Sequence, residues 1–212
     1  YSLLSNISNT VAGGNNLILG TTYSWVAAAN ASVSGESTVA VASGTITDIL
    51  NNITNADQIV VYTVIPTSSQ GCVGDPFTVS VTVRPEPKGF NDPLPIVCSD
   101  ATVNYDLATN IANIGAGGNN LVAGTTYSWV ATDNPSVTGE TLVAANTSVI
   151  NDILNNVTGS NQVVVYTIIP TSANGCIGDA FTVSVTVRPE PIGLADTDAV
   201  CSDEQINYNI QT

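Results

Sequence analysis

Hydrophobic and polar residues alternate along one stretch that occurs twice in the chain without a change. Residues 77–87 read Phe-Thr-Val-Ser-Val-Thr-Val-Arg-Pro-Glu-Pro, and residues 181–191 repeat them. A period of two predicts a β-strand with one face buried and the other in water. The prolines end the strand, because proline donates no ladder hydrogen bond and favours extended geometry at the residue before it. Each copy is therefore expected to finish a domain and to begin a short, stiff spacer.

The same duplication extends over the whole chain. When the sequence is shifted so that Tyr1 lies on Tyr105, roughly two-thirds of the positions in 1–89 are identical to their partners. Cys201 and Tyr208 then repeat Cys98 and Tyr105, which indicates the start of a third copy. Self-similarity at a fixed period identifies a repeat architecture. The chain is therefore interpreted as a window from a longer tandem array.

The repeat predicts the division of the chain into domains. Two modules of roughly 100 residues are each large enough for one core. The predicted divisions are a first β-sandwich at 1–87 without its N-terminal strand, a linker at 88–97, a complete second sandwich at 98–191, a linker at 192–200 and the start of a third repeat at 201–212.

The second copy shows the predicted order of elements. Strands are expected at 101–107, 125–130, 136–143, 162–170 and 181–187, with a Gly- and Asn-rich loop at 110–124 and a turn at 172–175. Residues 148–157 fit two patterns. A helical spacing joins Ile150, Ile153, Leu154 and Val157, whereas a strand could equally alternate through Ile150, Asp152 and Leu154. We expect a strand that contains one helical turn.

The composition and the aromatic residues indicate the fold class. Hydrophobic residues make up 43% of the chain but aromatic residues only 6%, so the cores must be mostly Val, Ile, Leu and Ala, which favours β structure. A lone Trp on a mid-domain strand resembles the core Trp of immunoglobulin-like sandwiches. We therefore predict an all-β fold of tandem immunoglobulin-like β-sandwich domains in a linear array. The expected core aromatic residues are Trp25, Trp129, Tyr62 and Tyr166.

The net charge of the chain limits the classes of molecule that it can be expected to bind. The formal net charge is -14, and a surface of this sign repels phosphate backbones and anionic lipids. We expect neither nucleic-acid binding nor electrostatic docking on membranes. Only 9% of residues are charged, so most of the surface must be Thr, Ser, Asn and Gly, a coat common in secreted bacterial surface proteins. No apolar run is long enough to span a membrane.

Cysteines recur in two classes, Cys72 with Cys176 and Cys98 with Cys201. In a chain without His, this regularity indicates a disulfide formed in an oxidising compartment rather than a zinc site. In a Greek-key sandwich, the turn before the last strand lies at the same end as the beginning of the first strand. This predicts a Cys98–Cys176 bond, whereas a Cys72–Cys98 bond would have to span the last strand. Cys72 would pair upstream of Tyr1, and Cys201 downstream of Thr212.

The sequence predicts no catalytic site. The absence of His excludes Ser-His-Asp and Cys-His arrangements and imidazole ligation of metals. Carboxylates such as Asp48 and Asp152 recur at equivalent positions in each copy. Recurrence in every copy suits a scaffold, whereas a catalytic pair would usually occur once. We therefore expect these carboxylates to be solvated or to cap turns.

Acidic residues in and beside the linkers are the weak candidates for calcium binding, and no other cofactor is expected. Hard cations take several oxygen ligands from segments of this kind. No spacing matches an EF-hand loop and the two linkers differ, so solvation is the favoured interpretation. The candidate calcium ligands are Asp92, Asp100, Asp196 and Asp198.

Several motifs together resemble the PKD-like repeat family. They are Val-Cys-Ser-Asp at 97–100, Thr-Tyr-Ser-Trp at 126–129, Val-Tyr-Thr-Ile-Ile-Pro-Thr at 165–171, Asn-Gly-Cys at 174–176 and Phe-Thr-Val-Ser-Val-Thr-Val at 181–187. The resemblance covers both full modules and the start of the third. It implies membership of the tandem arrays found in giant cell-surface proteins of gliding and related Bacteroidota-type bacteria. These proteins include gliding-motility adhesins exported by type IX secretion.

The resemblance and the composition together suggest an extracellular structural role. We expect a non-catalytic stalk segment of a bacterial cell-surface adhesin or filament used in attachment or gliding. Its partners would be neighbouring repeats of the same chain, with a surface, protein or polysaccharide ligand bound through other parts. The alternative is an accessory or carbohydrate- or protein-binding repeat of a secreted multidomain enzyme. The length of the full array would separate these hypotheses.

Overall fold

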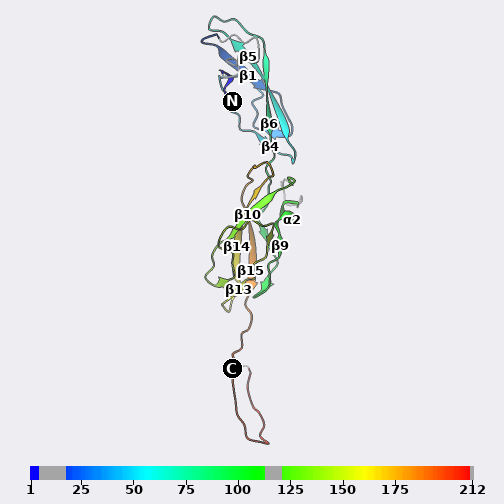
Figure 1. Ribbon diagram of the computed structural model, residues 1–212, viewed down its shortest axis with the longest axis vertical. Helices are drawn as coiled ribbons and strands as arrows, with labels where there is room; N and C mark the ends of the chain where they lie inside the picture. The colour runs from blue at the N-terminus through cyan, green and yellow to red at the C-terminus, as the bar shows by residue number, and fades with distance from the viewer. Residues whose placement is uncertain (5–17, 113–120, 211–212) are drawn as a thin grey trace.

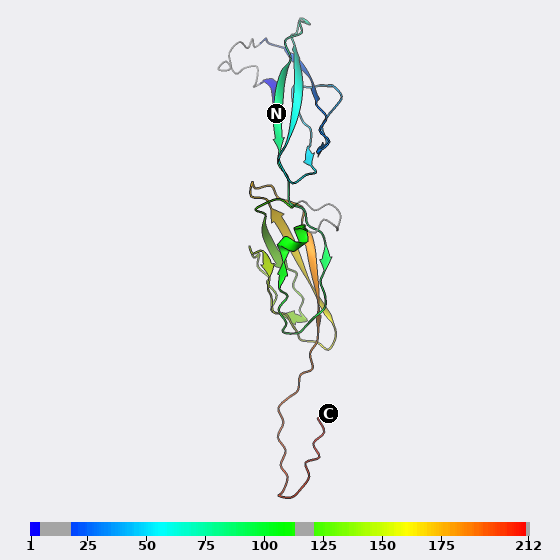
Figure 2. The same ribbon diagram turned by 90° about the vertical axis from the view of Figure 1, so that its right-hand side faces the viewer.

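The chain forms two β-rich modules that follow one another along a single long axis (Figure 1). The computed structural model describes residues 1–4, 18–112 and 121–210. The first module lies at the N-terminal end, and the second lies directly below it in the view. Residues past the second module run on in the same direction as an extended segment and then turn back (Figure 2).

A four-stranded antiparallel sheet forms the larger layer of the first module. The strands of this module are β1 (Thr22–Ala27), β2 (Val33–Ser34), β3 (Val41–Ala42), β4 (Asn51–Asn52), β5 (Gln58–Thr67) and β6 (Phe77–Val83). The order in the sheet is β3-β1-β5-β6, so the long strand β5 is central. The short strands β2 and β4 pair with each other outside this sheet.

The second module repeats this arrangement and adds elements at its start. Its elements are β7 (Asp92–Pro93), β8 (Val97–Cys98), β9 (Tyr105–Asp106), α2 (Leu107–Ala112), β10 (Thr126–Ala131), β11 (Val137–Thr138), β12 (Val149–Ile150), β13 (Asn155–Asn156), β14 (Gln162–Thr171) and β15 (Phe181–Arg188). The large sheet has the order β10-β14-β15-β7, and β8 also pairs with β15. Two small pairs, β9 with β12 and β11 with β13, form the facing layer. Buried residues from both layers join one core, so the module is a β-sandwich.

Aromatic residues on neighbouring strands lie at the centre of each core. Trp129 of β10 and Tyr166 of β14 meet edge to face, with ring centroids 5.7 Å apart. Trp25 and Tyr62 repeat the arrangement at 5.6 Å in the first module. Edge-to-face pairs add stabilisation beyond the area that they bury. All four side chains expected in the cores are buried, and the predicted all-β sandwich fold is confirmed.

Residues 101–112 fold differently from the prediction of a strand followed by a loop. The strand is confined to β9, and helix α2 begins directly after it. Leu107 and Ile111 lie one helical turn apart and are both fully buried, which gives the short helix an apolar face. The Asp106 carboxylate accepts a hydrogen bond from the Ala108 amide at 3.0 Å and so caps the first turn. The part of the predicted loop at 113–120 lies outside the described residues.

Residues 148–157 alternate as in a strand and contain no helical turn. Ile150 and Leu154 are fully buried and Asp152 is buried between them, whereas Ile153 is 55% and Val157 58% exposed. The strand pattern is favoured because β12 and β13 each pair with a neighbour in the facing layer. The helical spacing of Ile153 and Val157 was therefore coincidental.

The segment 88–97 differs from the predicted linker because most of it packs on the second module. Strand β7 pairs in parallel with β15 at Val183 and Ser184, and β8 pairs with the same strand at Val187 and Arg188. The outer edge of β15 has unpaired backbone groups, and an extended chain beside it satisfies them. The second predicted linker, 192–200, contains no strand among the described residues.

This added segment explains why the two copies of the identical strand are buried to different degrees. Val183, Val185 and Val187 of β15 are fully buried. Their counterparts on β6 include Val81 and Val83, which are only half-buried. Among the described residues, β6 is the edge strand of its sheet, whereas β7 and β8 cover the same edge of β15. The edge segment thus completes the core of a module.

Candidate functional site

The spacer between the modules is packed rather than free. Pro85 and Pro87 are both buried at the junction of the first and second modules. The same prolines at the end of the second copy, Pro189 and Pro191, are half-buried and exposed. Identical residues are therefore buried where a folded module follows them. At the junction, one module of the chain packs against the next. We take this contact as the candidate functional site.

Two glycines allow the backbone of the spacer to approach the second module closely. A Cβ atom at Gly178, in the turn between β14 and β15, would lie 1.8 Å from the carbonyl oxygen of Pro87. A Cβ atom at Gly89 would lie 2.4 Å from ring carbons of Phe181. Both contacts are shorter than any side chain tolerates, so these positions require glycine. The close approach fixes the spacer against the end of the sheet.

Hydrogen bonds from the second module hold the segment after the spacer. Asn110 of α2 is 1% exposed and reaches back to Phe90. Its Oδ1 accepts from the Phe90 amide at 3.0 Å, and its Nδ2 donates to the Phe90 carbonyl at 2.9 Å. Asn91 Oδ1 accepts from the Thr182 amide at 2.8 Å. These bonds satisfy backbone groups that would otherwise be unpaired at the junction.

A tyrosine and an aspartate extend this network into β7. The Tyr105 hydroxyl donates to Asp92 Oδ2 at 2.6 Å and accepts from Asn110 Nδ2 at 3.1 Å. Burial, followed by the bond to the Asp92 carboxylate, raises the pKa of Tyr105, so its hydroxyl stays protonated as a donor. The pair recurs past the second module, where Tyr208 donates to Asp196 at 2.7 Å on an exposed segment. There the hydrogen bond from Tyr208 lowers the pKa of Asp196.

Inside each module, one recurring carboxylate is held by three donors. Asp152 accepts hydrogen bonds from the Thr141 amide at 2.8 Å, the Thr141 hydroxyl at 2.6 Å and the Tyr166 hydroxyl at 2.9 Å. Burial and the neighbouring Asp152 charge raise the pKa of Tyr166. The carboxylate therefore ties the facing layer to the central strand. Its bonds are directed within the fold, as a structural brace requires.

The first module contains the same brace with Ser in place of Thr. Asp48 accepts from the Ser37 amide and hydroxyl at 2.8 and 2.7 Å and from the Tyr62 hydroxyl at 2.9 Å. Burial by itself would raise the pKa of Asp48, but the hydrogen bonds from Ser37 and Tyr62 outweigh it and lower the pKa. The expectation that these carboxylates would be solvated or would cap turns is wrong for this pair, because each one accepts hydrogen bonds from two distant parts of its module.

The four calcium candidates lie at separate places. Asp92 lies near the N-terminal end of β15 and accepts a hydrogen bond from Tyr105, whereas Asp100 lies beyond the C-terminal end of that strand. Asp196 is bonded to Tyr208, and Asp198 accepts a hydrogen bond from the Ala199 amide at 2.8 Å. Asp100 does face Glu190, and their hydrogen bond and charge raise the pKa of Glu190. The described residues contain no group of three or more acidic, Cys or His side chains arranged to hold a metal ion.

The cysteines lie at opposite ends of the second module, which contradicts the predicted Cys98–Cys176 bond. Cys98 pairs with Arg188 at the far end of β15, while Cys176 lies in the turn that precedes Phe181 at the near end. The eight residues of β15 make seven steps of ~3.4 Å and so span ~24 Å, whereas bonded cysteines need Cα atoms within ~7 Å. The prediction failed because it took Cys98 as the beginning of the first strand, which instead begins earlier and ends at Cys98. None of the four cysteines is bonded to another in this structure.

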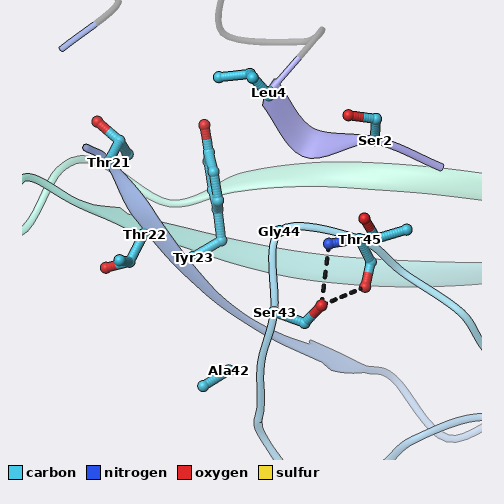
Figure 3. A pocket seen from close by; sticks show the side chains of 9 residues that line it. All are labelled: Ser2, Leu4, Thr21, Thr22, Tyr23, Ala42, Ser43, Gly44 and Thr45. Atoms are coloured by element: carbon cyan, nitrogen blue, oxygen red, sulfur yellow. Dashed lines mark hydrogen bonds between the residues drawn. The ribbon is translucent and has the colours of Figure 1, made fainter. Parts of the chain in front are cut away.

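A hollow of about 540 Å³ lies beside β1 in the first module (Figure 3). Its lining residues are Ser2, Leu4, Thr21, Thr22, Tyr23, Ala42, Ser43, Gly44 and Thr45. The Ser43 hydroxyl donates to the Thr45 carbonyl at 2.9 Å and accepts from the Thr45 amide at 3.1 Å. The described residues that line it contribute hydroxyl groups and apolar side chains.

The glycines and the asparagine that form the junction were not among the site residues predicted from the sequence. Gly89 and Gly178 recur as Gly193 and Gly74 in the repeat register, and Asn110 recurs as Asn6. Recurrence was the available signal, but it marks every shared position equally. The contacts of these residues involve segments far apart in the chain. Only the folded arrangement separates them from the many other repeated positions.

The fold and its junction define a class of protein, the tandem structural repeat built from β-sandwich modules. A family model for the PKD-like domain matches the chain twice, over residues 6–87 and 95–191. The chain therefore belongs to the PKD-like domain family, as its motifs predicted. Comparison with the curated proteins found no match. In the described part of the chain, no helix has the length and apolar character needed to cross a bilayer.

Proposed function

We propose that this chain is a stalk segment of a long extracellular repeat protein at a bacterial cell surface. The observation that carries the proposal is the continuity of the chain through the junction. Strand β6 ends the first module, its proline spacer is buried, and the next residues enter the sheet of the second module as β7 and β8. The spacer that ends one module thus continues directly into the edge segment of the next module. Because each module contacts only its neighbours, further copies lengthen the row through the same kind of junction.

The strand order suits a module that carries tension. The chain enters the second module at β7 and leaves it at the far end of β15, and the two strands run parallel. Backbone bonds join them, from the Leu94 amide to the Ser184 carbonyl at 2.8 Å and from the Ser99 amide to the Arg188 carbonyl at 2.9 Å. A pull along the axis slides the strands past each other and loads these bonds together. Bonds loaded together resist a pull better than bonds opened one at a time.

The composition supports an extracellular setting for this stalk. The net charge of -14 comes from few charged residues, so the surface is mainly small and uncharged. Family membership supports a structural role. On these grounds we propose an adhesin or filament used in attachment or gliding and exported by type IX secretion. Its surface, protein or polysaccharide ligand would bind through other parts of the protein.

Two measurements in solution test the stiffness of the stalk, and a labelling experiment tests its location. Residual dipolar couplings of the reduced chain should fit one alignment tensor for both modules, and small-angle X-ray scattering should give a maximum dimension that grows linearly as modules are added. Independent tensors for the two modules would contradict a stiff stalk. In the native organism, antibodies to this chain should label threads that extend from the cell surface. Labelling confined to a secreted hydrolase would instead support an accessory role.

A further inference from the structure

We propose that the cysteines join consecutive modules, with one disulfide at each junction. The bond would link the cysteine in the turn before a module's last strand to the cysteine at the far end of the preceding module. In this chain the first class comprises Cys72 and Cys176, and the second comprises Cys98 and Cys201. The inference rests on the proposed stalk, because it requires modules in a row. It goes beyond the stalk by assigning a covalent link to every junction.

The two classes of cysteine lie at opposite ends of a module. Cys176 lies in the turn between β14 and β15, which faces the first module (Figure 2). Cys98 pairs with Arg188, at the end from which the chain leaves the second module. A module therefore presents one thiol class at its entry end and the other at its exit end. In a row, every junction brings together an exit cysteine and an entry cysteine.

The distances between the cysteines exclude the other pairings within one chain. Cys98 and Cys176 are separated by the length of β15, so they cannot bond within a module. Cys72 and Cys176 lie in equivalent turns of adjacent modules, one whole module apart, and Cys98 and Cys201 are likewise one repeat apart. The remaining combination in a single chain is an exit cysteine with the entry cysteine of the next module. For Cys176, that partner would stand upstream of Tyr1.

Contacts at the junction carry the third step. The turn that holds Cys176 touches the spacer, since Gly178 lies against the carbonyl of Pro87. Pro87 follows Arg84 by three residues, and Arg84 is the counterpart of Arg188, the residue beside Cys98. An exit cysteine in the first module would thus stand beside Arg84, a few residues from the turn of Cys176. Both thiol classes reach solvent, since Cys98 is exposed and Cys176 partly exposed.

The chemistry is an ordinary two-electron oxidation. One S–S bond forms as two S–H bonds break, and the two electrons and two protons pass to a disulfide oxidant. Oxidised glutathione serves as that oxidant in the experiment, and it is reduced to two molecules of glutathione. The thiol–disulfide oxidants of an extracellular or periplasmic compartment would have the same role. The product would prevent a stretched junction from separating.

The test adds an exit cysteine to the first module. Residues 89–104 are copied ahead of Tyr1, which places a new cysteine in the first module at the position that Cys98 holds in the second. After oxidation with glutathione, thiol titration should show the loss of two thiols per monomer, and peptide mapping should find the new cysteine bonded to Cys176. Cys176→Ser should abolish the bond, and Cys72→Ser should leave it intact. A new cysteine bonded to Cys72, or still free in the folded chain, would overturn the proposal.

A second chain provides an independent test if the first extension does not fold. Residues 110–191 are copied after Thr212, which completes the third module. Here Cys98 should bond to the added copy of Cys176. Dipolar couplings of both reduced chains report the stalk separately from the bond. If all modules share one alignment tensor but no disulfide forms, the disulfide proposal is wrong and the stalk is unaffected. If the modules have independent alignment tensors, the proposed stiff stalk is wrong.

Discussion

Asn110 both donates to and accepts from the backbone of Phe90, at 2.9 and 3.0 Å, and so joins helix α2 to the segment that enters from the first module. Asn110 is almost entirely shielded from water. Asn110→Ala would leave the amide and carbonyl of Phe90 without partners. We expect the second module to lose about 2 kcal/mol of unfolding free energy, measured by urea denaturation. Asn91→Ala, at an exposed bond to Thr182, should cost clearly less.

Gly178 and Gly74 are equivalent positions with different neighbours, and they allow a matched comparison. Ala at Gly178 would place its Cβ 1.8 Å from the Pro87 carbonyl oxygen, whereas Ala at Gly74 would meet a Pro66 side-chain carbon at 3.0 Å. Gly178→Ala should therefore displace the spacer and separate the alignment tensors of the two modules. Gly74→Ala should leave a single tensor. Equal effects of the two substitutions would show that the close approach does not fix the junction.

The hydroxyl of Tyr166 contributes through its bond to Asp152 rather than through packing alone. Tyr166→Phe keeps the ring but removes one of three donors to a buried carboxylate. Hydrogen bonds to charged groups contribute about 1.5–3 kcal/mol, so we expect the second module to lose that much stability in chemical denaturation. Tyr208→Phe is the control, because its bond to Asp196 is on the surface. A change below about 0.5 kcal/mol for Tyr166→Phe would contradict the brace.

Acid should destabilise the first module through Asp48. Hydrogen bonds hold the pKa of Asp48 below its ordinary value of 3.8, so the unfolded chain takes up a proton first as the pH falls. This contribution to stability is complete above the ordinary value and is lost as the pH falls through the lowered folded value. NMR-detected unfolding of the first module between about pH 5 and pH 2 should show this loss. Asp48→Asn should flatten the dependence, and substitution of the exposed Asp57 by Asn should preserve it.

Both tryptophans should resist collisional quenching. Trp25 and Trp129 are each 2% exposed, and the Trp129 indole donates to the carbonyl and hydroxyl oxygens of Thr147 at 3.1 Å. Acrylamide should quench the fluorescence of the native chain weakly and that of the urea-unfolded chain strongly. A native chain quenched as readily as free tryptophan would place an aromatic side chain on the surface of each module. That result would favour a carbohydrate-binding role over a stalk.

Local pattern predicted the long strands well and the short elements poorly. The strands β14 and β15 lie where the alternating Val and Ile residues indicated, because a half-buried strand imposes a period of two on its own residues. Helix α2 escaped notice because six residues are too few to show a helical period. The edge strands β7 and β8 consist of two residues each, so they also had no period to display. Their partners on β15 lie far away in the chain.

The sequence by itself determined the repeat, the order of the long strands and the aromatic residues of each core, because these depend on residue identity and on short-range periodicity. Only the tertiary structure decided that the segment before Cys98 runs parallel to β15, and hence at which end of a module each cysteine lies. The direction of an edge strand depends on which neighbouring backbone groups remain unpaired once the sheet has formed. That condition exists only in the folded module, and it separates Cys98 from Cys176 by the length of β15.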